Sequence, residues 1–181
     1  MKYCEHNTKN HHTAIKYDKI VNSIYLVLDK EGCLLKNSSP FFNKTFIIID
    51  GDELENHFCC DDGRDLSCKN KSVDIIFAID GSTSKEMQLV ELKLNCKDKF
   101  YHLDKTSFRQ KADSSKLALG NSIPFAKKHL IIFEKSVLNQ AKHFLYRINP
   151  VLGNDFIAID VENLFTKYFN SSNCVIVKKK H

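Results

Sequence analysis

The sequence has no run of 18 or more apolar residues, and its first twelve residues, MKYCEHNTKNHH, have no apolar core of the kind that a secretory signal needs. From the first absence we expect no transmembrane helix and no membrane partner, and from the second a cytoplasmic protein. The chain also shows no internal repeat and no low-complexity linker. At 181 residues, with 43% apolar and 27% charged side chains, it fits one globular domain with a core of its own.

No CxxC pair occurs among the seven cysteines, although structural zinc sites usually use paired ligands at short spacing. Without an export signal, the cysteines are expected to be reduced thiols, several of them buried. One cluster leaves a zinc site open as an alternative, and in that case the protein would be a zinc-stabilised interaction module. The cluster consists of His57, Cys59, Cys60 and Cys68.

The formal net charge of +5 is a weak indication of an anionic partner, and its distribution is more informative. Between residues 93 and 128 there are nine Lys or Arg residues and three acids. A local excess of this kind favours nucleic-acid binding, because neutralising phosphates releases counterions.

Apolar periodicity predicts an α/β (α+β) fold with a mixed central sheet flanked by helices. The Asp-Gly pair at 80–81 predicts an antiparallel hairpin between two neighbouring strands. Residues 1–12 are expected to be a polar leader outside the core, which spans about 13–135, with an α/β extension over 136–181. Helices are expected over 13–29, 104–119, 136–148 and, briefly, 162–169, and strands over 45–50, 73–79, 88–95, 129–134, 155–161 and 173–180.

Three charged residues have a spacing that suits metal-dependent phosphodiester hydrolysis. Glu91 and Lys93 are two residues apart in a predicted strand, so their side chains share one face, about 6–7 Å apart. Asp74 begins the preceding strand, where an unpaired carboxylate among apolar residues would be unfavourable. Mg²⁺, for which Mn²⁺ often substitutes, binds one or two carboxylates and activates water. We therefore expect a Mg²⁺ site formed by Asp74, Glu91 and the backbone carbonyl of Leu92, with Lys93 assisting the water.

The segments VDIIFAI and QLVELKLN, followed by a helix containing FRQK, resemble the PD-(D/E)xK nuclease superfamily over roughly residues 13–135. The order helix, three strands, helix, strand matches the restriction-endonuclease-like core of that superfamily. The resemblance implies catalytic roles for Asp74, Glu91 and Lys93. Val73 stands where the name-giving proline would be. Because an ExK triplet is expected about once by chance in this composition, its mid-strand position matters more than its presence.

The resemblance also implies that the protein is a metal-dependent endonuclease that acts on DNA rather than RNA. It further implies a role in prokaryotic restriction or defence and, as in many members, a homodimer. An additional upstream acid occurs in some members, and Asp18, Glu53 and Glu55 are all open candidates here. In the helix predicted over 104–119, Lys105, Arg109 and Lys116 form a basic stripe that we expect to contact phosphates. The alternative is a catalytically inactive nuclease-like fold that binds nucleic acid or a protein partner.

Overall fold

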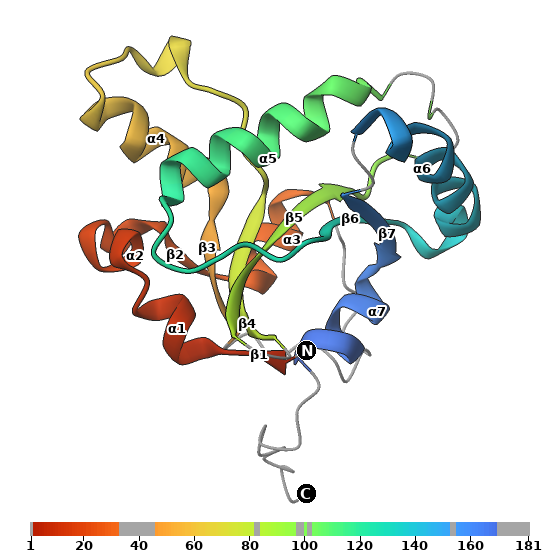
Figure 1. The fold of residues 1–181 in the computed structure, drawn as a ribbon, viewed down its shortest axis with the longest axis horizontal. Coiled ribbons are helices and arrows are strands. Elements are labelled where there is room, and N and C mark those ends of the chain that lie inside the picture. Colours follow the sequence, from red (N-terminus) through yellow and green to blue (C-terminus); the bar gives the residue numbers. More distant parts are fainter. Residues whose placement is uncertain are drawn as a thin grey trace, which may run out of the picture.

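A mixed sheet forms the centre of the protein (Figure 1). The structure, a computed structural model, describes residues 2–32, 46–81, 84–96, 100, 103–152 and 155–169. Its described strands form one seven-stranded sheet in the order β2-β3-β4-β5-β6-β7, with β1 paired to β4 outside this series. They are β1 (Lys2–Tyr3), β2 (Val21–Ser23), β3 (Ile47–Asp50), β4 (Ile75–Asp80), β5 (Lys85–Lys93), β6 (His129–Phe133) and β7 (Phe156–Asp160).

The type of strand pairing changes once across the sheet, at β5. Strands β2 to β5 pair antiparallel with their neighbours, whereas β5, β6 and β7 run parallel. The predicted hairpin is confirmed, because β4 pairs with β5 in a register that sets Ile75 opposite Val90 and Asp80 opposite Lys85. Continuing that register by one residue sets Asp74 opposite Glu91. The strand predicted over 173–180 lies outside the described residues.

Helices cover both faces of the sheet. The α-helices are α1 (Glu5–Lys9), α2 (His12–Lys16), α3 (Ile24–Lys30), α4 (Gly51–Asp61), α5 (Lys105–Leu119), α6 (Leu138–Leu152) and α7 (Val161–Leu164). Short 3-10 turns are η1 (Asp18–Ile20), η2 (Leu66–Cys68) and η4 (Lys135–Val137), and a π-helical turn, η5, covers Phe165–Phe169. Helices α4, α5 and α6 lie on one face, with α3 on the other (Figure 1). Within the described residues, no helix is both long and apolar enough to cross a membrane.

The alternation of side chains along each strand separates two buried clusters. In β5, Leu89 packs into the cluster beneath α4, α5 and α6, whereas Val90 and Leu92 pack into the cluster beneath α3 and α7. Val90, Leu92 and Leu94 thus face a core on the side away from Glu91 and Lys93. The two polar side chains therefore emerge under α5.

The N-terminal third differs from the prediction. The helix expected over 13–29 is interrupted by η1 and by β2, because residues 21–23 pair with β3 and Ser23 then caps α3 by accepting a hydrogen bond from the Tyr25 N–H. Residues 2–12, expected as a leader outside the core, add β1 to the sheet and bury Thr8 and His11. Local periodicity missed these features because the pairing partners are remote in sequence.

Two further boundaries also differ. The segment 51–72, for which the polar sequence predicts irregular structure or one short helix, contains the eleven-residue helix α4, which the Asp50 side chain caps by accepting hydrogen bonds from the N–H groups of Asp52 and Glu53. The helix expected over 136–148 continues to Leu152, so that Pro150 lies inside α6 near its C-terminal end. The extension predicted over 136–181 contributes β7 to the same sheet as the core.

A glycine at the start of α4 allows two segments to approach closely. A Cβ atom at Gly51 would lie 1.8 Å from the carbonyl oxygen of Val73, a backbone atom that cannot rotate away. At this point the Gly51 N–H donates to the carbonyl of Asp74 at 3.1 Å. Gly51 therefore positions the backbone of Asp74 against the end of β3.

We predict that Gly51→Ala forces the backbone at Asp74 to shift. The shift should lower the free energy of unfolding by roughly 1–3 kcal/mol or more. Gly63→Ala is the control, because Gly63 has a positive φ of 70° but no neighbouring atom within 4 Å of its Cβ position. It should show only the strain of that backbone conformation. Chemical denaturation of both variants measures the difference, and equal losses would contradict a steric role for position 51.

Candidate active site at the ends of β4 and β5

The structure brings Asp74, Glu91 and Lys93 together on the face beneath α5. The Lys93 ammonium Nζ lies 2.5 Å from Glu91 Oε1, and Asp74 Oδ2 accepts a hydrogen bond of 2.5 Å from the backbone N–H of Leu92. Because the register sets Asp74 opposite Glu91, the two carboxylates belong to one polar site at the end of the hairpin. The predicted ligand Leu92 thus holds Asp74 through its N–H, while its side chain lies in the core.

Glu91 is the most buried member of this site, with 3% of the residue exposed. Its Oε1 accepts hydrogen bonds from two lysines, Lys93 and Lys111, the latter at 2.7 Å. Its other oxygen, Oε2, is buried and has no hydrogen-bond partner among the described residues. A buried carboxylate oxygen without a partner is unfavourable in an apolar environment and favours the approach of a cation or water.

Lys111 is a site residue that the sequence analysis did not identify. It lies three residues after Phe108 and four before Ser115, both on the buried face of α5, and its own side chain is only 20% exposed. This spacing, a lysine at the margin of a helix's apolar face, was the available signal. Burial tends to lower the pKa of Lys111, but Glu91 and Asp74 outweigh burial and raise it, so the group stays charged.

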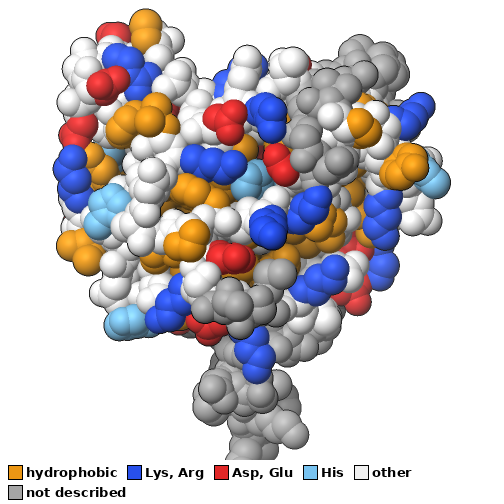
Figure 2. Space-filling view, viewed as in Figure 1, with side chains coloured by type: hydrophobic (Ala, Val, Ile, Leu, Met, Phe, Trp, Pro, Cys, Tyr) orange, Lys and Arg blue, Asp and Glu red, His pale blue; other side chains and the backbone are white. Residues whose placement is uncertain are grey.

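The predicted basic stripe lies elsewhere. With 3.6 residues per turn, Arg109 and Lys116 lie on the flank of α5 opposite Lys111. Arg109 contacts Asp155 at 3.4 Å, just before β7, and Lys116 lies over the ring of Phe125. The side chain of Lys105 lies outside the described part of the structure. On the face that carries α5, blue basic side chains are scattered among red acidic ones rather than gathered in one patch (Figure 2).

A cavity of about 230 Å³ adjoins the site and includes Asp74 in its lining. Its other ionisable side chains are four acids and two lysines. The acids are Glu31, Asp50, Asp52 and Glu53, and the lysines are Lys30 and Lys69. Among the three candidates for an upstream acid, Glu53 lines this cavity, Asp18 is exposed in η1, and Glu55 is buried elsewhere. The cavity thus extends the acidic character of the site toward the start of α4.

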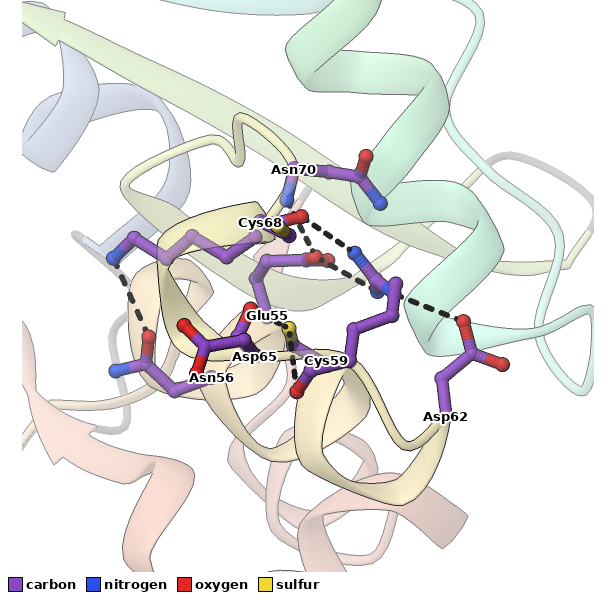
Figure 3. Close-up of polar contacts among 9 residues, drawn as sticks. Glu55, Asn56, Cys59, Asp62, Asp65, Cys68 and Asn70 are labelled. Atoms are coloured by element: carbon purple, nitrogen blue, oxygen red, sulfur yellow. Dashed lines mark hydrogen bonds and ion pairs between the residues drawn. The ribbon is translucent and has the colours of Figure 1, made fainter.

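Polar contacts connect the C-terminal end of α4, which carries Cys59 and Cys60, with η2, which carries Cys68 (Figure 3). Arg64 donates to Glu55 at 3.2 Å and to the Cys68 carbonyl at 3.1 Å, and Glu55 also accepts from the Asn70 N–H. The Cys59 thiol lies 3.3 Å from the Asp65 carbonyl, and burial raises its pKa, which disfavours the thiolate that zinc requires. Across the described ranges, no three His, Cys, Asp or Glu side chains are close enough to hold a metal ion.

Asp74 has an unusual protonation equilibrium. Burial, reinforced by the negative charge of Glu91, raises its pKa to about 8, although Lys111 and the Leu92 N–H act in the opposite direction. An unfolded aspartate titrates near 3.9, so between about pH 4 and pH 8 the folded chain binds more protons than the unfolded chain. Linkage then requires that the stabilising effect is full below pH 4 and is lost as the pH rises through 8.

We predict that Asp74→Asn removes this pH dependence, because asparagine keeps an oxygen for the Leu92 N–H but does not ionise. The difference in unfolding free energy between variant and natural chain should move in favour of the variant between pH 5 and pH 8, by at most about 1.4 kcal/mol per pH unit. Urea denaturation at several pH values measures it. A difference that is independent of pH would contradict the raised pKa.

Comparison of the chain with protein-family models, with curated proteins and with solved structures finds no match. The chemistry of the site therefore has to be inferred from its own side chains. At one end of the sheet these are two carboxylates, two ammonium groups and an acidic cavity. Carboxylates can hold a hard divalent cation together with water and substrate oxygens, and ammonium groups can pair with phosphate.

Proposed function

We propose that this protein is a metal-dependent nuclease that hydrolyses phosphodiester bonds of DNA, with Asp74, Glu91 and Lys93 as its catalytic residues. The observation that carries this proposal is the unpartnered, buried Oε2 of Glu91 beside Asp74, in a site that already contains ammonium groups. Two carboxylates at such close quarters repel each other, and a divalent cation would remove the repulsion. Mg²⁺ suits them, because it needs only one or two carboxylates and keeps waters for the rest.

The order of elements supports the same proposal. Strands β3, β4 and β5 form an antiparallel series, and β5 continues through α5 into the parallel strand β6. Apart from helix α4, which lies between β3 and β4, this order is similar to that of the restriction-endonuclease-like core that the sequence resembles. Asp74 precedes the second of these strands and Glu91 and Lys93 end the third, as the resemblance implies.

In the proposed reaction, Asp74 and Glu91 would hold the ion and the Leu92 carbonyl would complete the protein ligands, while Glu53 lines the adjoining cavity. When bound, the ion would lower the pKa of a coordinated water and neutralise charge on the phosphate. Lys93, whose side chain is 26% exposed, orients that water or helps to remove its proton. A place in prokaryotic restriction or defence, and action as a homodimer, are further parts of the proposal that follow from the resemblance.

The decisive experiment incubates the natural chain with plasmid DNA and with RNA, with and without Mg²⁺ or Mn²⁺. We expect metal-dependent cleavage of DNA that Glu91→Gln and Lys93→Ala each reduce by about 100-fold or more. The matched control is Lys135→Ala, which removes an exposed lysine paired with Glu162 and should leave the rate unchanged. Nucleic-acid binding without cleavage would favour the inactive nuclease-like alternative, and cleavage that survives both active-site substitutions would exclude this site.

We also propose that Lys105, Arg109 and Lys116 contact the phosphate backbone from the far flank of α5. Arg109 is half exposed, so breaking its surface pair with Asp155 requires little free energy. Arg109→Ala should weaken DNA binding equally for all sequences and reduce the slope of log affinity against log salt by about 1. Fluorescence anisotropy at several salt concentrations measures this slope, and an unchanged slope would argue against the contact.

A further inference from the structure

Glu91 has more positive charge around it than its own neutralisation requires. Lys93 reaches its Oε1 from the same strand, and Lys111 reaches the same oxygen from α5, at 2.5 and 2.7 Å. One ammonium group is enough to pair with one carboxylate, and keeping a second lysine 80% buried beside it carries a desolvation penalty. The second lysine therefore calls for an explanation beyond the ion pair.

Acidic residues of the cavity contribute to the electrostatic environment of Lys111. The negative charges that act on it come from Glu91, Asp74 and Asp52, and the last two line the 230 Å³ cavity beside the site. A lysine side chain has four rotatable bonds and three donors, so its ammonium can exchange one oxygen partner for another nearby. Lys111, which already contacts Glu91 and interacts with the charge of Asp74, is thus suited to pair with an anion that binds at these two carboxylates.

Charge balance indicates which anion this is. A divalent ion bound by two carboxylates forms an assembly with no net charge, and Lys93 and Lys111 then remain as two unpaired cations. A phosphodiester carries one negative charge, and a second develops when an oxygen nucleophile adds to phosphorus. Two ammonium groups match that charge, and one would leave it half neutralised.

We propose that Lys111 is a second substrate-facing cation of this site, which leaves Glu91 when a divalent ion binds and then pairs with a non-bridging oxygen of the scissile phosphate. This inference rests on the proposed nuclease function. During hydrolysis the oxygen of water bonds to phosphorus while the ester P–O bond breaks, and the proton lost by the water balances the one gained by the leaving oxygen. Lys111 keeps its own proton throughout and acts only on the charge of the phosphate.

The proposal makes opposite predictions for the rate and for metal affinity. Lys111→Ala should lower kcat by about 100-fold, as does removal of other donors that stabilise a developing oxyanion, with KM changed much less. It should leave Mn²⁺ affinity unchanged or make it several-fold tighter, because a cation that competes for Glu91 is gone. Lys111→Arg should recover part of kcat. A lysine that merely held Glu91 in place would give the reverse, weaker Mn²⁺ binding on its loss.

The experiment measures kcat and KM on DNA, Mn²⁺ binding to the DNA-free protein by calorimetry, and thermal unfolding, for the natural chain and these two variants. Lys142→Ala, an exposed lysine of α6, is the matched control and should behave as the natural chain. Wild-type kcat in Lys111→Ala, or weakened Mn²⁺ binding in that variant, overturns the role of Lys111 while Glu91-dependent cleavage still stands. If the natural chain neither binds Mn²⁺ nor cleaves DNA, the proposed function itself fails.

Discussion

The buried carboxylate of Glu91 is the constraint around which this end of the molecule is organised. A negative charge with 3% exposure in the middle of a sheet must be offset by nearby cations or donors. Lys93 supplies one from the same strand, and Lys111 supplies another from α5. The second contact ties α5 to β5 at a polar point, in addition to the apolar contacts of Phe108 and Ala112.

Backbone contacts also hold the site in place. Gly51 lets the start of α4 approach the segment before β4, and its N–H binds the Asp74 carbonyl. The Asp74 carboxylate in turn accepts a hydrogen bond from the N–H of Leu92. Two hydrogen bonds at Asp74 therefore connect the start of α4, the start of β4 and the end of β5. Side chains placed in this way have little freedom, which is the preorganisation that a metal or phosphate site requires.

Such an arrangement has a cost for folding. Asp74 is held in a place where its charged form is disfavoured, as the pKa of about 8 indicates, and one oxygen of Glu91 has no partner in the described part of the structure. Unfavourable polar groups of this kind concentrate at functional sites, because binding there relieves them. The large apolar clusters on both faces of the sheet provide the stability that tolerates them.

Much of this was determined by the sequence itself. The two-residue spacing of Glu91 and Lys93 predicted that both share one face, and the Asp-Gly turn predicted the hairpin that sets Asp74 opposite Glu91. Both inferences depend on short-range geometry, in which strand period and turn type follow from neighbouring residues. The same short range explains why the helix predicted over 13–29 was wrong, since β2 exists only through its pairing with β3.

Only the tertiary structure decided which basic residues reach the carboxylates. Arg109 and Lys116 looked the better candidates along the chain, but α5 packs with their flank turned toward Asp155 and Phe125, and Lys111 faces Glu91 instead. The placement of Glu53 in the same cavity as Asp74, and of residues 2–12 within the fold, was likewise decided by packing between distant segments. Helical periodicity defines which residues share a flank, but the rotation of a helix on its sheet is set by the fit of its apolar side chains to the remainder of the core.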